Sequence, residues 1–366
     1  MYDAFMSFYK ENASRLAAKI AEKNAALRAE AVPVIRPIFA DMADLNEGGK
    51  LLRGVLVNLG CRIAGVEDVS VSDGAALAFE IFQTGVLIHD DIIDRALSRR
   101  GKPTIQVRYA ASLTERGLTP PTDGDTRERI AESAALCAGD FMIYDANLYL
   151  AETYGERAGE IIAAFDRIML DTVRGELLDT ILPVEFSGSA DKAQNDKDLM
   201  AAIYRIYHLK TSLYSVLGPL DMGLLIGGAS GEDRAAFAEM ADELGIAFQI
   251  KDDLLGIYAD EKELGKDVGS DISEFKQTIL YAYLRLNDPA AYEELLTYYG
   301  KASISREDLA AVQELFERSG ARAYAEEAQE ECFRKAEEKL ADLDFVSEEN
   351  KAIIRDFIAY SRDRRK

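Results

Sequence analysis

Three aspartates stand close together in LIHDDIIDRALSRRGKPT, the segment from position 87 to position 104. Asp90 and Asp94 are four residues apart, so on a helix they share one face, and Asp91 lies beside them. Carboxylates this close repel one another and raise each other's pKa unless a cation lies among them. Because Mg²⁺ prefers hard oxygen ligands and completes its shell with water and phosphates, the spacing predicts a magnesium site.

A second acidic pair, Asp252 and Asp253, follows the apolar stretch 241–250. The flank of the first cluster, 75–88, is also apolar and contains no proline, so we expect a buried helix that ends near His89. A lone pair of aspartates is more often a solvated helix end, but a position after an apolar helix weakens that alternative. If the two clusters face each other, they can hold a diphosphate through several magnesium ions and stabilise its charge as it leaves.

Basic residues that could bind such phosphates occur near the first cluster. In GGKLLRG, positions 48–54, Lys50 and Arg53 share a helical face, and the paired glycines let backbone approach an anion closely. A glycine pair alone usually forms only a turn. Arg99 and Arg100 directly follow the first aspartates, and guanidinium groups match phosphate oxygens well.

Two further basic positions accompany the second cluster. Lys210 and Thr211 form a polar pair inside the apolar segment IYHLKTSLY, where a buried lysine needs an anionic partner. Lys266 follows the second aspartates in LGKDVGSD. Taken together, the carboxylates and cations favour chemistry on a diphosphate.

The elements that must position these residues are helical. Apolar residues recur at helical spacing along the chain, and the alternation typical of strands is almost absent. Polar stretches that could separate domains are short, and 307–360 is typical of packed amphipathic helices. We therefore expect one all-α domain over residues 1–366.

Composition narrows the function further. The chain of 366 residues has a formal net charge of −22, so we expect no nucleic-acid partner and no anionic lipid surface. The three cysteines are far apart and the histidines number only two, which argues against a cysteine or histidine metal centre. The N-terminus lacks the apolar core of a signal peptide, and the most apolar stretch, 213–229, falls short of a membrane span. We expect a cytoplasmic protein.

Four motifs, GGKLLRG, HDDIIDRALSRRGKPT, HLKTSLY and FQIKDDLLGIYADEKELGKDVGSD, occur in the order and spacing of the polyprenyl synthetase family, the trans-isoprenyl diphosphate synthases. The chain resembles that family from about residue 46 to 285. The resemblance implies an isoprenoid synthase-type helical bundle around a deep central cavity, working as a homodimer. It also implies head-to-tail condensation of isopentenyl diphosphate with an allylic diphosphate, with several Mg²⁺ ions per active site.

The resemblance assigns roles to individual residues. Carboxylates would hold magnesium on the allylic diphosphate: Asp90, Asp91, Asp94 and Asp252, with Asp253 farther from the metal. The allylic diphosphate would be bound by Arg99, Lys210, Thr211, Gln249 and Lys266, with Lys276 as a further candidate. Isopentenyl diphosphate would be bound by Lys50, Arg53, Gln83 and Arg100. The residues expected to matter most for catalysis are Asp90, Asp94, Arg99, Lys210, Asp252 and Lys266.

In the implied mechanism, magnesium and basic residues draw diphosphate off the allylic carbon, and the isopentenyl double bond attacks the resulting carbocation. Two features depart from the family. Gly256 stands where many members have an aspartate, and the segment between 104 and 139 is longer, which predicts an added surface loop near 112–130. The basic C-terminus, 362–366, is either a solvated tail or a segment that closes over the diphosphates, as in some members.

Two other interpretations remain open. A class I terpene cyclase would lack an isopentenyl site and carry a second metal motif with Ser/Thr and Glu ligands, and GGKLLRG and DDLLG argue against it. A non-catalytic partner subunit would have lost the cluster at Asp90 or at Asp252, and both are present.

Product length is expected to depend on the helix before the first aspartates. Gly85, Phe82 and Phe79 lie at one-turn intervals along it. Gly85 has no side chain to stop a growing chain, and Phe82 would form the floor one turn deeper. This predicts geranylgeranyl diphosphate, with farnesyl diphosphate or a longer polyprenyl diphosphate as alternatives; ordinary core packing of both phenylalanines is the competing interpretation.

Overall fold

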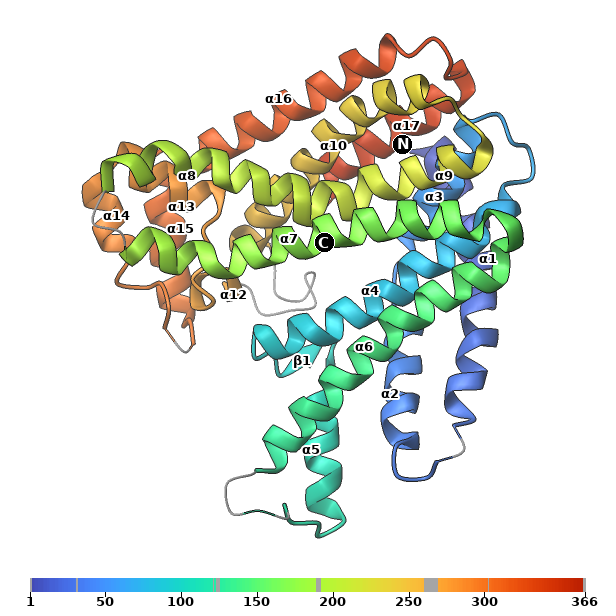
Figure 1. Ribbon diagram of the computed structural model, residues 1–366. Helices are drawn as coiled ribbons and strands as arrows, with labels where there is room; N and C mark the ends of the chain where they lie inside the picture. The colour runs from blue at the N-terminus through green and yellow to red at the C-terminus, as the bar shows by residue number, and fades with distance from the viewer. Residues whose placement is uncertain are drawn as a thin grey trace. The chain divides into compact units, whose positions relative to one another are not determined.

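The computed structural model describes residues 2–30, 32–120, 122, 126–188, 192–259, 269–301 and 303–364. Most of these residues are helical, and the strands among them are the two-residue β1 (Ser98–Arg99) and β2 (Lys102–Pro103), which pair antiparallel (Figure 1). The predicted all-α fold class is confirmed. The deep central cavity stays a prediction.

Backbone contacts group the chain into two compact units. The Asp90 unit comprises Met6–Ala163 and Met222–Gly227. The Asp252 unit comprises Met1–Phe5, Ala164–Asp221 and Gly228–Lys366. Each unit carries one of the two aspartate clusters, and the prediction of a single domain over 1–366 stays a prediction.

The helices of the Asp90 unit follow one another with short connections. They are most of α1 (Asp3–Arg28), α2 (Arg36–Glu47), α3 (Leu52–Ile63), η1 (Val69–Ser72), α4 (Asp73–Ile93), α5 (Ile105–Glu115), α6 (Arg127–Tyr154), η2 (Gly155–Arg157), the start of α7 (Ala158–Gly188) and the end of α9 (Gly218–Gly227). Helix α4 packs against α3 and α6, and Figure 1 shows α4 and α6 side by side. The predicted added loop lies between α5 and α6, which themselves cover both ends of the range 112–130.

Helix α4 forms because its sequence is apolar, lacks proline and begins with an acidic first turn. It continues to Ile93, so it ends one turn later than expected, and Asp94 caps it. Among the described residues, one stretch, Val69–Ile93, is long and apolar enough to cross a membrane. Because 83% of its apolar window is buried in the protein, it shows the burial of a core helix.

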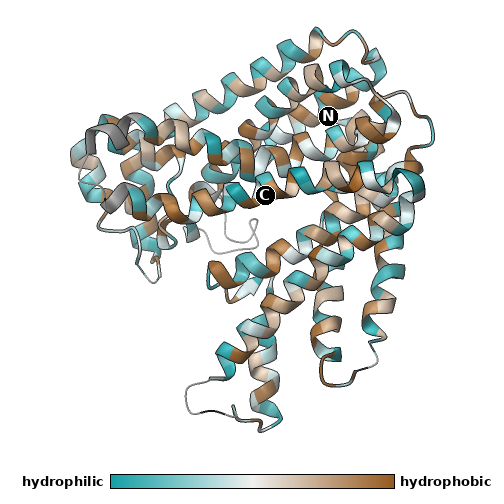
Figure 2. Ribbon diagram, in the orientation of Figure 1, coloured by the Kyte–Doolittle hydropathy of each residue, from teal (hydrophilic) through white to brown (hydrophobic). Residues whose placement is uncertain are grey.

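The Asp252 unit contains the other helices of the described residues. They are the remainder of α7, α8 (Lys192–Ile206), the π-helix η3 (Tyr207–Leu217), the start of α9 (Gly218–Gly227), α10 (Gly231–Tyr258), α12 (Ser270–Ser273), α13 (Ile279–Asn287), α14 (Pro289–Leu295), α15 (Arg306–Arg318), α16 (Ala321–Ala341) and α17 (Glu348–Asp363). Helix α10 packs against η3 and α16. Figure 2 shows hydrophobic and hydrophilic residues interspersed along α16, as expected for an amphipathic helix with one buried face.

Two local features of this unit bear on the site. Asp252 and Asp253 lie inside α10, which continues to Tyr258, so the acidic pair does not follow a helix as the sequence suggested. Lys210 and Thr211 lie on η3, and π-helical segments are rare and often occur at functional sites. A Cβ on Gly175 of α7 would come 2.6 Å from the backbone nitrogen of Lys210, so a glycine is needed for this close approach.

Candidate active site

The first aspartate cluster lies at the C-terminal end of α4. Asp91 is buried, with 1% of its surface exposed, and its Oδ1 accepts hydrogen bonds from Arg99 at 2.7 Å from Nε and 2.6 Å from Nη2. Burial raises the pKa of Asp91 above its usual range, although the Arg99 charge opposes the change. The amide of Gln106 donates to the Asp91 backbone carbonyl at 2.9 Å and so holds the end of the helix.

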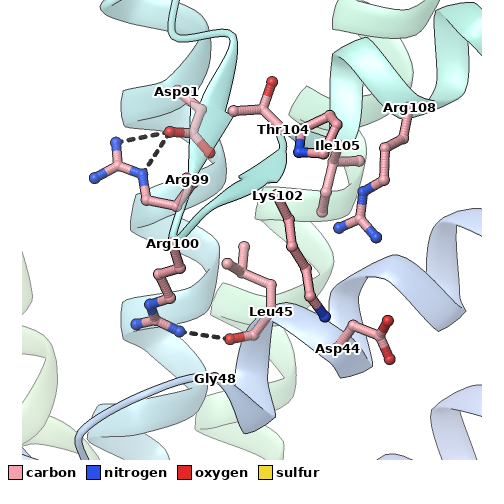
Figure 3. Close-up of a pocket in the computed structure, with 11 residues that line it drawn as sticks. Asp44, Leu45, Gly48, Asp91, Arg99, Arg100, Lys102, Thr104, Ile105 and Arg108 are labelled. Atoms are coloured by element: carbon pink, nitrogen blue, oxygen red, sulfur yellow. Dashed lines mark hydrogen bonds and ion pairs between the residues drawn. The ribbon is translucent and has the colours of Figure 1, made fainter. Parts of the chain in front are cut away.

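The two arginines that follow the aspartates are directed apart by a tight turn. Arg100 and Gly101 have φ values of 55° and 73°, and positive φ at both central residues is typical of a type I′ hairpin turn. The turn joins β1 to β2 and places Arg99 on Asp91, whereas Arg100 donates from Nη1 to the backbone carbonyl of Leu45 at 2.8 Å (Figure 3).

A pocket of about 160 Å³ lies beside this hairpin (Figure 3). Four basic side chains line it: Arg99, Arg100, Lys102 and Arg108. The carboxylates of Asp44 and Asp91 line it as well, and Arg108 Nη1 pairs at 2.6 Å with Asp41 Oδ1. In a chain with a net charge of −22, this local excess of basic groups is suited to an anion. Sequence analysis did not single out Lys102 or Arg108, although both lie within or just after the motif that contains the arginines.

The GGKLLRG segment leads into α3 beside Arg100. A Cβ on Gly48 would come 3.2 Å from Arg100 Nη1, so the glycine allows the guanidinium to lie against the backbone. Tyr9 donates to the backbone carbonyl of Lys50 at 2.5 Å, and the Lys50 side chain is exposed. The Gln83 Oε1 atom is buried and has no hydrogen-bond partner within the described part of the chain. These positions are compatible with their predicted roles, which stay predictions.

Glu80 is a residue of this region that sequence analysis missed. It lies on α4, is 6% exposed, and accepts a hydrogen bond from the Gly54 backbone nitrogen at 2.8 Å. Burial raises the pKa of Glu80, while the charges of Arg53 and Arg100 oppose the change. A lone glutamate within the apolar run ALAFEIF was the available signal, because a buried charge requires partners.

The second aspartate cluster is paired with a residue from the end of the chain. Arg364 Nη2 lies 2.5 Å from Asp252 Oδ1, and the guanidinium stacks on the Phe248 ring with its carbon 3.7 Å from the ring centroid. The Arg364 side chain is 10% exposed, so this part of the basic C-terminus is packed against α10. Lys366 lies outside the described residues, and closure over substrates stays a prediction.

Asp253 has a different environment from Asp252. Its carboxylate accepts hydrogen bonds from the Tyr207 hydroxyl and, at 2.8 Å, from the Gln249 amide nitrogen. Burial raises the pKa of Asp253 to about 8. The Thr211 hydroxyl donates to Gln249 Oε1, so this predicted diphosphate-binding pair is linked to Asp253 in the structure.

Gly256 stands where many family members have an aspartate, and the carboxylate of Asp271 lies beside it. A Cβ on Gly256 would come 2.5 Å from Oδ2 of Asp271, so the glycine leaves room for this buried side chain. Lys276 Nζ lies 3.9 Å from Asp271 Oδ1 and 2.6 Å from Glu274 Oε2. The loss of a carboxylate at position 256 therefore does not leave that part of α10 without one.

Lys210 has the anionic partners that its burial required. Its Nζ lies 2.9 Å from Glu176 Oε2 and 2.6 Å from Asp179 Oδ2. Burial alone would lower the pKa of Lys210, but the charges of Asp179 and Glu176 outweigh it and raise the pKa. Sequence analysis missed both carboxylates. Lys266, the other predicted basic residue near this cluster, lies outside the described residues.

The two aspartate clusters supply the kind of oxygen donor that magnesium prefers. The carboxylates of Asp90, Asp91, Asp94 and Asp252 are the hard oxygen ligands that Mg²⁺ prefers. Among the described residues, no group of three Asp, Glu, His or Cys side chains is arranged to hold a metal alone. An ion that shares its shell with water and substrate phosphates needs fewer protein ligands, and the metal-binding roles of these aspartates stay predictions.

The residues predicted to set product length are core residues of α4. Phe82 is 4% exposed and Phe79 is fully buried. A Cβ on Gly85 would come 2.8 Å from the backbone carbonyl of Gly139 on α6. Gly85 is thus required for α4 and α6 to approach, which accounts for this glycine without a growing product chain.

Comparisons with known proteins identify the class. The family model described as polyprenyl synthetase matches residues 36–316. The chain is 33% identical over 271 residues, 72% of each chain, to the geranylgeranyl diphosphate synthase of Sulfolobus acidocaldarius. It is 30% identical over 317 residues, 86% of this chain and 87% of the other, to a short chain isoprenyl diphosphate synthase of Methanothermobacter thermautotrophicus.

A solved structure gives the same result. The geranylgeranyl pyrophosphate synthase of Corynebacterium glutamicum, complexed with isoprenyl diphosphate and magnesium, superposes with a TM-score of 0.84. The two sequences are 26% identical, and 99% of each chain is covered. The protein is an enzyme of the trans-prenyltransferase class. The chain belongs to the polyprenyl synthetase family.

Proposed function

We propose that the enzyme condenses isopentenyl diphosphate head to tail with an allylic diphosphate in a magnesium-dependent reaction. The hairpin between β1 and β2 is the observation that best supports the proposal. It directs Arg99 to the aspartates of α4 and Arg100 to the GGKLLRG segment. One turn therefore provides guanidinium groups for two adjacent diphosphates, one at the aspartates and one at GGKLLRG.

The allylic diphosphate is assigned to the aspartates and to the basic residues near them. Carboxylates that would hold the metal are Asp90, Asp91, Asp94 and Asp252. Residues that would bind the diphosphate are Arg99, Lys210, Thr211, Gln249 and Lys266. Bound magnesium would supply positive charge to the departing diphosphate. Isopentenyl diphosphate is assigned to Lys50, Arg53, Gln83 and Arg100.

The residues of the chain act by binding and orientation. The carbon–oxygen bond of the allylic substrate breaks, and its diphosphate leaves with the electron pair. The terminal carbon of the isopentenyl double bond then forms a carbon–carbon bond to the allylic carbon, and a proton passes to the released diphosphate. Arg99 and Lys210 stabilise the charge on that diphosphate, and Lys50, Arg53 and Arg100 fix the position of the attacking double bond.

Geranylgeranyl diphosphate is the proposed main product. The 33% identical relative that carries this product in its name supports the choice, and burial of Phe82 is compatible with a floor at that level. The alternatives are farnesyl diphosphate and a longer polyprenyl diphosphate. The purified enzyme is to be incubated with labelled isopentenyl diphosphate and dimethylallyl, geranyl or farnesyl diphosphate in turn. We expect the main product to contain twenty carbons with every primer. A main product of fifteen carbons, or of more than twenty, would contradict this assignment.

A homodimer is proposed as the working form. On α7, Leu170, Val173, Leu177, Ile181 and Val184 are about half or more exposed and recur at intervals of three and four residues. That spacing is typical of helices that pair through an apolar seam, and a second copy of the chain offers the same seam about a two-fold axis. We expect Leu177→Glu with Ile181→Glu to give a monomer in sedimentation, whereas an unchanged mass would place the interface elsewhere. Cytoplasmic location stays a prediction.

A further inference from the structure

The beginning of α3 lacks the usual means of satisfying its backbone donors. The residue that precedes the helix, Leu51, has a φ of 57° and no side-chain capping hydrogen bond. The first turn of a helix leaves backbone N–H groups without helical partners, and it carries a partial positive charge. Glu80 reaches this turn from α4, and its Oε1 accepts the N–H of Gly54 at 2.8 Å.

The same carboxylate is near two basic residues of the predicted isopentenyl diphosphate site. The charges of Arg53 and Arg100 both act on Glu80. Glu80 Oε2 and Arg100 Nη2 each lie 3.7 Å from the position that a Cβ on Gly49 would take, so both side chains lie against the same glycine. Arg100 has a positive φ, which disfavours a residue with a side chain, so contacts outside the turn must stabilise it.

We infer that Glu80 is a positioning residue for isopentenyl diphosphate: its buried carboxylate fixes the first turn of α3 and holds Arg53 and Arg100 where they meet the diphosphate. This inference rests on the proposed function. Glu80 itself does not touch the substrate, because a carboxylate would repel it. Its effect on the substrate passes through the two arginines and the GGKLLRG backbone.

A positioning role and a purely electrostatic role for Glu80 predict opposite changes in the KM for isopentenyl diphosphate when the Glu80 charge is removed. A purely electrostatic role for Glu80 would make the site more positive after Glu80→Gln, and the KM for isopentenyl diphosphate would fall. Loss of a buried carboxylate leaves its arginine partners without a counter-charge, and they move toward water. Misplacement of binding groups by about 1 Å reduces rates by up to about a hundredfold. We expect the loss of position to exceed the gain in charge.

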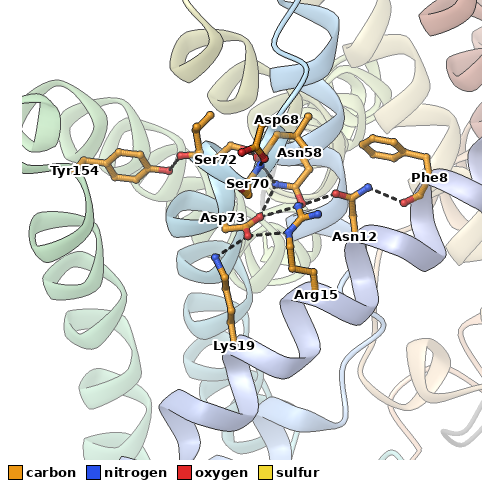
Figure 4. A network of polar contacts seen from close by, with 12 residues as sticks. Phe8, Asn12, Arg15, Lys19, Asn58, Asp68, Ser70, Ser72, Asp73 and Tyr154 are labelled. Atoms are coloured by element: carbon orange, nitrogen blue, oxygen red, sulfur yellow. Dashed lines mark hydrogen bonds and ion pairs between the residues drawn. The ribbon is translucent and has the colours of Figure 1, made fainter.

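Asp73 provides a matched control on the same helix. It is 2% exposed, and it pairs with Arg15 at 2.9 Å and with Lys19 at 2.8 Å (Figure 4). Asn58 also donates to it, at 3.1 Å. Asp73 and Glu80 are therefore both buried carboxylates of α4 with two basic partners, but Asp73 lies at the other end of the helix from the aspartate cluster.

The experiment compares the steady-state kinetics of the full-length wild type, Glu80→Gln and Asp73→Asn. Glu80→Gln retains an oxygen that can accept the Gly54 N–H but loses the charge. We expect it to raise the KM for isopentenyl diphosphate about ten- to hundredfold and to leave the allylic KM near the wild-type value. Asp73→Asn should change neither KM. An unchanged or lower isopentenyl KM in Glu80→Gln would overturn the inference, as would equal changes in both variants.

Two further experiments apply if Glu80→Gln does not fold or if the wild type is inactive. If Glu80→Gln does not fold by circular dichroism, Glu80→Asp keeps the charge on a shorter side chain, and a smaller rise in the isopentenyl KM alone is expected. Equal rises in both KM values with Glu80→Asp would overturn the inference. If the wild type condenses nothing, the proposed function fails. Calorimetric titration with isopentenyl diphosphate still tests Glu80, because weaker binding by Glu80→Gln is expected and equal binding contradicts its role.

Discussion

In the Asp90 unit, Asp91 is paired with Arg99, which is eight residues further along the chain. In the Asp252 unit, Asp252 is paired with Arg364, which is 112 residues away. The first pair needs only the end of a helix and a tight hairpin, whereas the second forms only once the C-terminal segment has packed on α10. Similar carboxylate–guanidinium pairs therefore depend on local structure in one region and on the tertiary fold in the other.

The two pairs would respond differently to a bound substrate. If the proposed allylic diphosphate binds through magnesium, Arg99 and Arg364 can exchange their carboxylate partners for phosphate oxygens. Arg99 remains tethered by the hairpin when this occurs. Arg364 lies just after the end of α17, and its contact with Asp252 is supported by stacking against Phe248.

The largest expected effect comes from removing either cluster. Asp90→Ala and Asp252→Ala should each reduce turnover by about a thousandfold or more, because charge on the departing diphosphate loses several kcal/mol of stabilisation. Both variants should retain the wild-type circular dichroism spectrum, since neither side chain belongs to the apolar core. If one variant is nearly as active as the wild type when purified, the two regions do not act in the same reaction.

A smaller and more selective effect should separate the two substrates. Lys50→Ala or Arg53→Ala should raise the KM for isopentenyl diphosphate about ten- to hundredfold, with little change for the allylic primer. Lys210→Ala should weaken the allylic side and lower kcat, because the leaving diphosphate gains charge as its bond breaks. Steady-state kinetics with each substrate varied in turn makes this measurement. Equal effects on both substrates would mean that the division between the two sites is wrong.

Product length tests the apolar part of α4. Phe82→Ala should lengthen the main product if Phe82 forms the floor of the cavity, and Phe79→Ala, one turn deeper and equally apolar, is the matched control. Gly85→Phe is not a suitable variant, since even a Cβ at Gly85 would come 2.8 Å from the Gly139 carbonyl. Chromatographic sizing of the products makes the comparison. Unchanged product after Phe82→Ala would identify this phenylalanine as ordinary core.

The smallest effect concerns the ion pairs of Asp73 with Arg15 and Lys19, which lie away from the proposed substrate sites. Burial alone would raise the pKa of Asp73, but hydrogen bonds and charges from Arg15 and Lys19 outweigh it and lower the pKa. A lowered folded-state pKa stabilises the protein above the ordinary aspartate pKa of about 3.9, and the stabilisation is lost as pH falls through the folded-state value.

Asp73→Asn should therefore reduce the free energy of unfolding by about 1 to 3 kcal/mol at neutral pH. The difference from the wild type should shrink as the pH falls below about 4. Urea unfolding at several pH values measures it. A difference that does not depend on pH would show that the Asp73 charge is not what stabilises this contact.

The sequence predicted the helical fold, because the fold depends on apolar periodicity, whereas the roles of the aspartates in both clusters stay predictions. The sequence also indicated that a buried Lys210 needs an anionic partner. The identity of the carboxylates beside Lys210 depends on the packing of α7 against η3. The sequence signalled that a buried Glu80 would need partners and that residues 362–366 are basic, but the partners of Glu80 and Arg364 depend on tertiary packing. The substitution at Gly256 suggested the loss of a carboxylate, whereas the structure places Asp271 beside it.

The central claim is that the enzyme joins isopentenyl diphosphate to an allylic diphosphate. Measuring the stoichiometry of a single condensation tests this claim most directly. Purified enzyme is supplied with farnesyl diphosphate, labelled isopentenyl diphosphate and magnesium, and the product and released diphosphate are both quantified. We predict one diphosphate released for each isopentenyl unit incorporated, a linear geranylgeranyl diphosphate product, and loss of both signals when magnesium is chelated. A cyclic hydrocarbon without incorporation of label, or release of diphosphate that continues without magnesium, would contradict the claim.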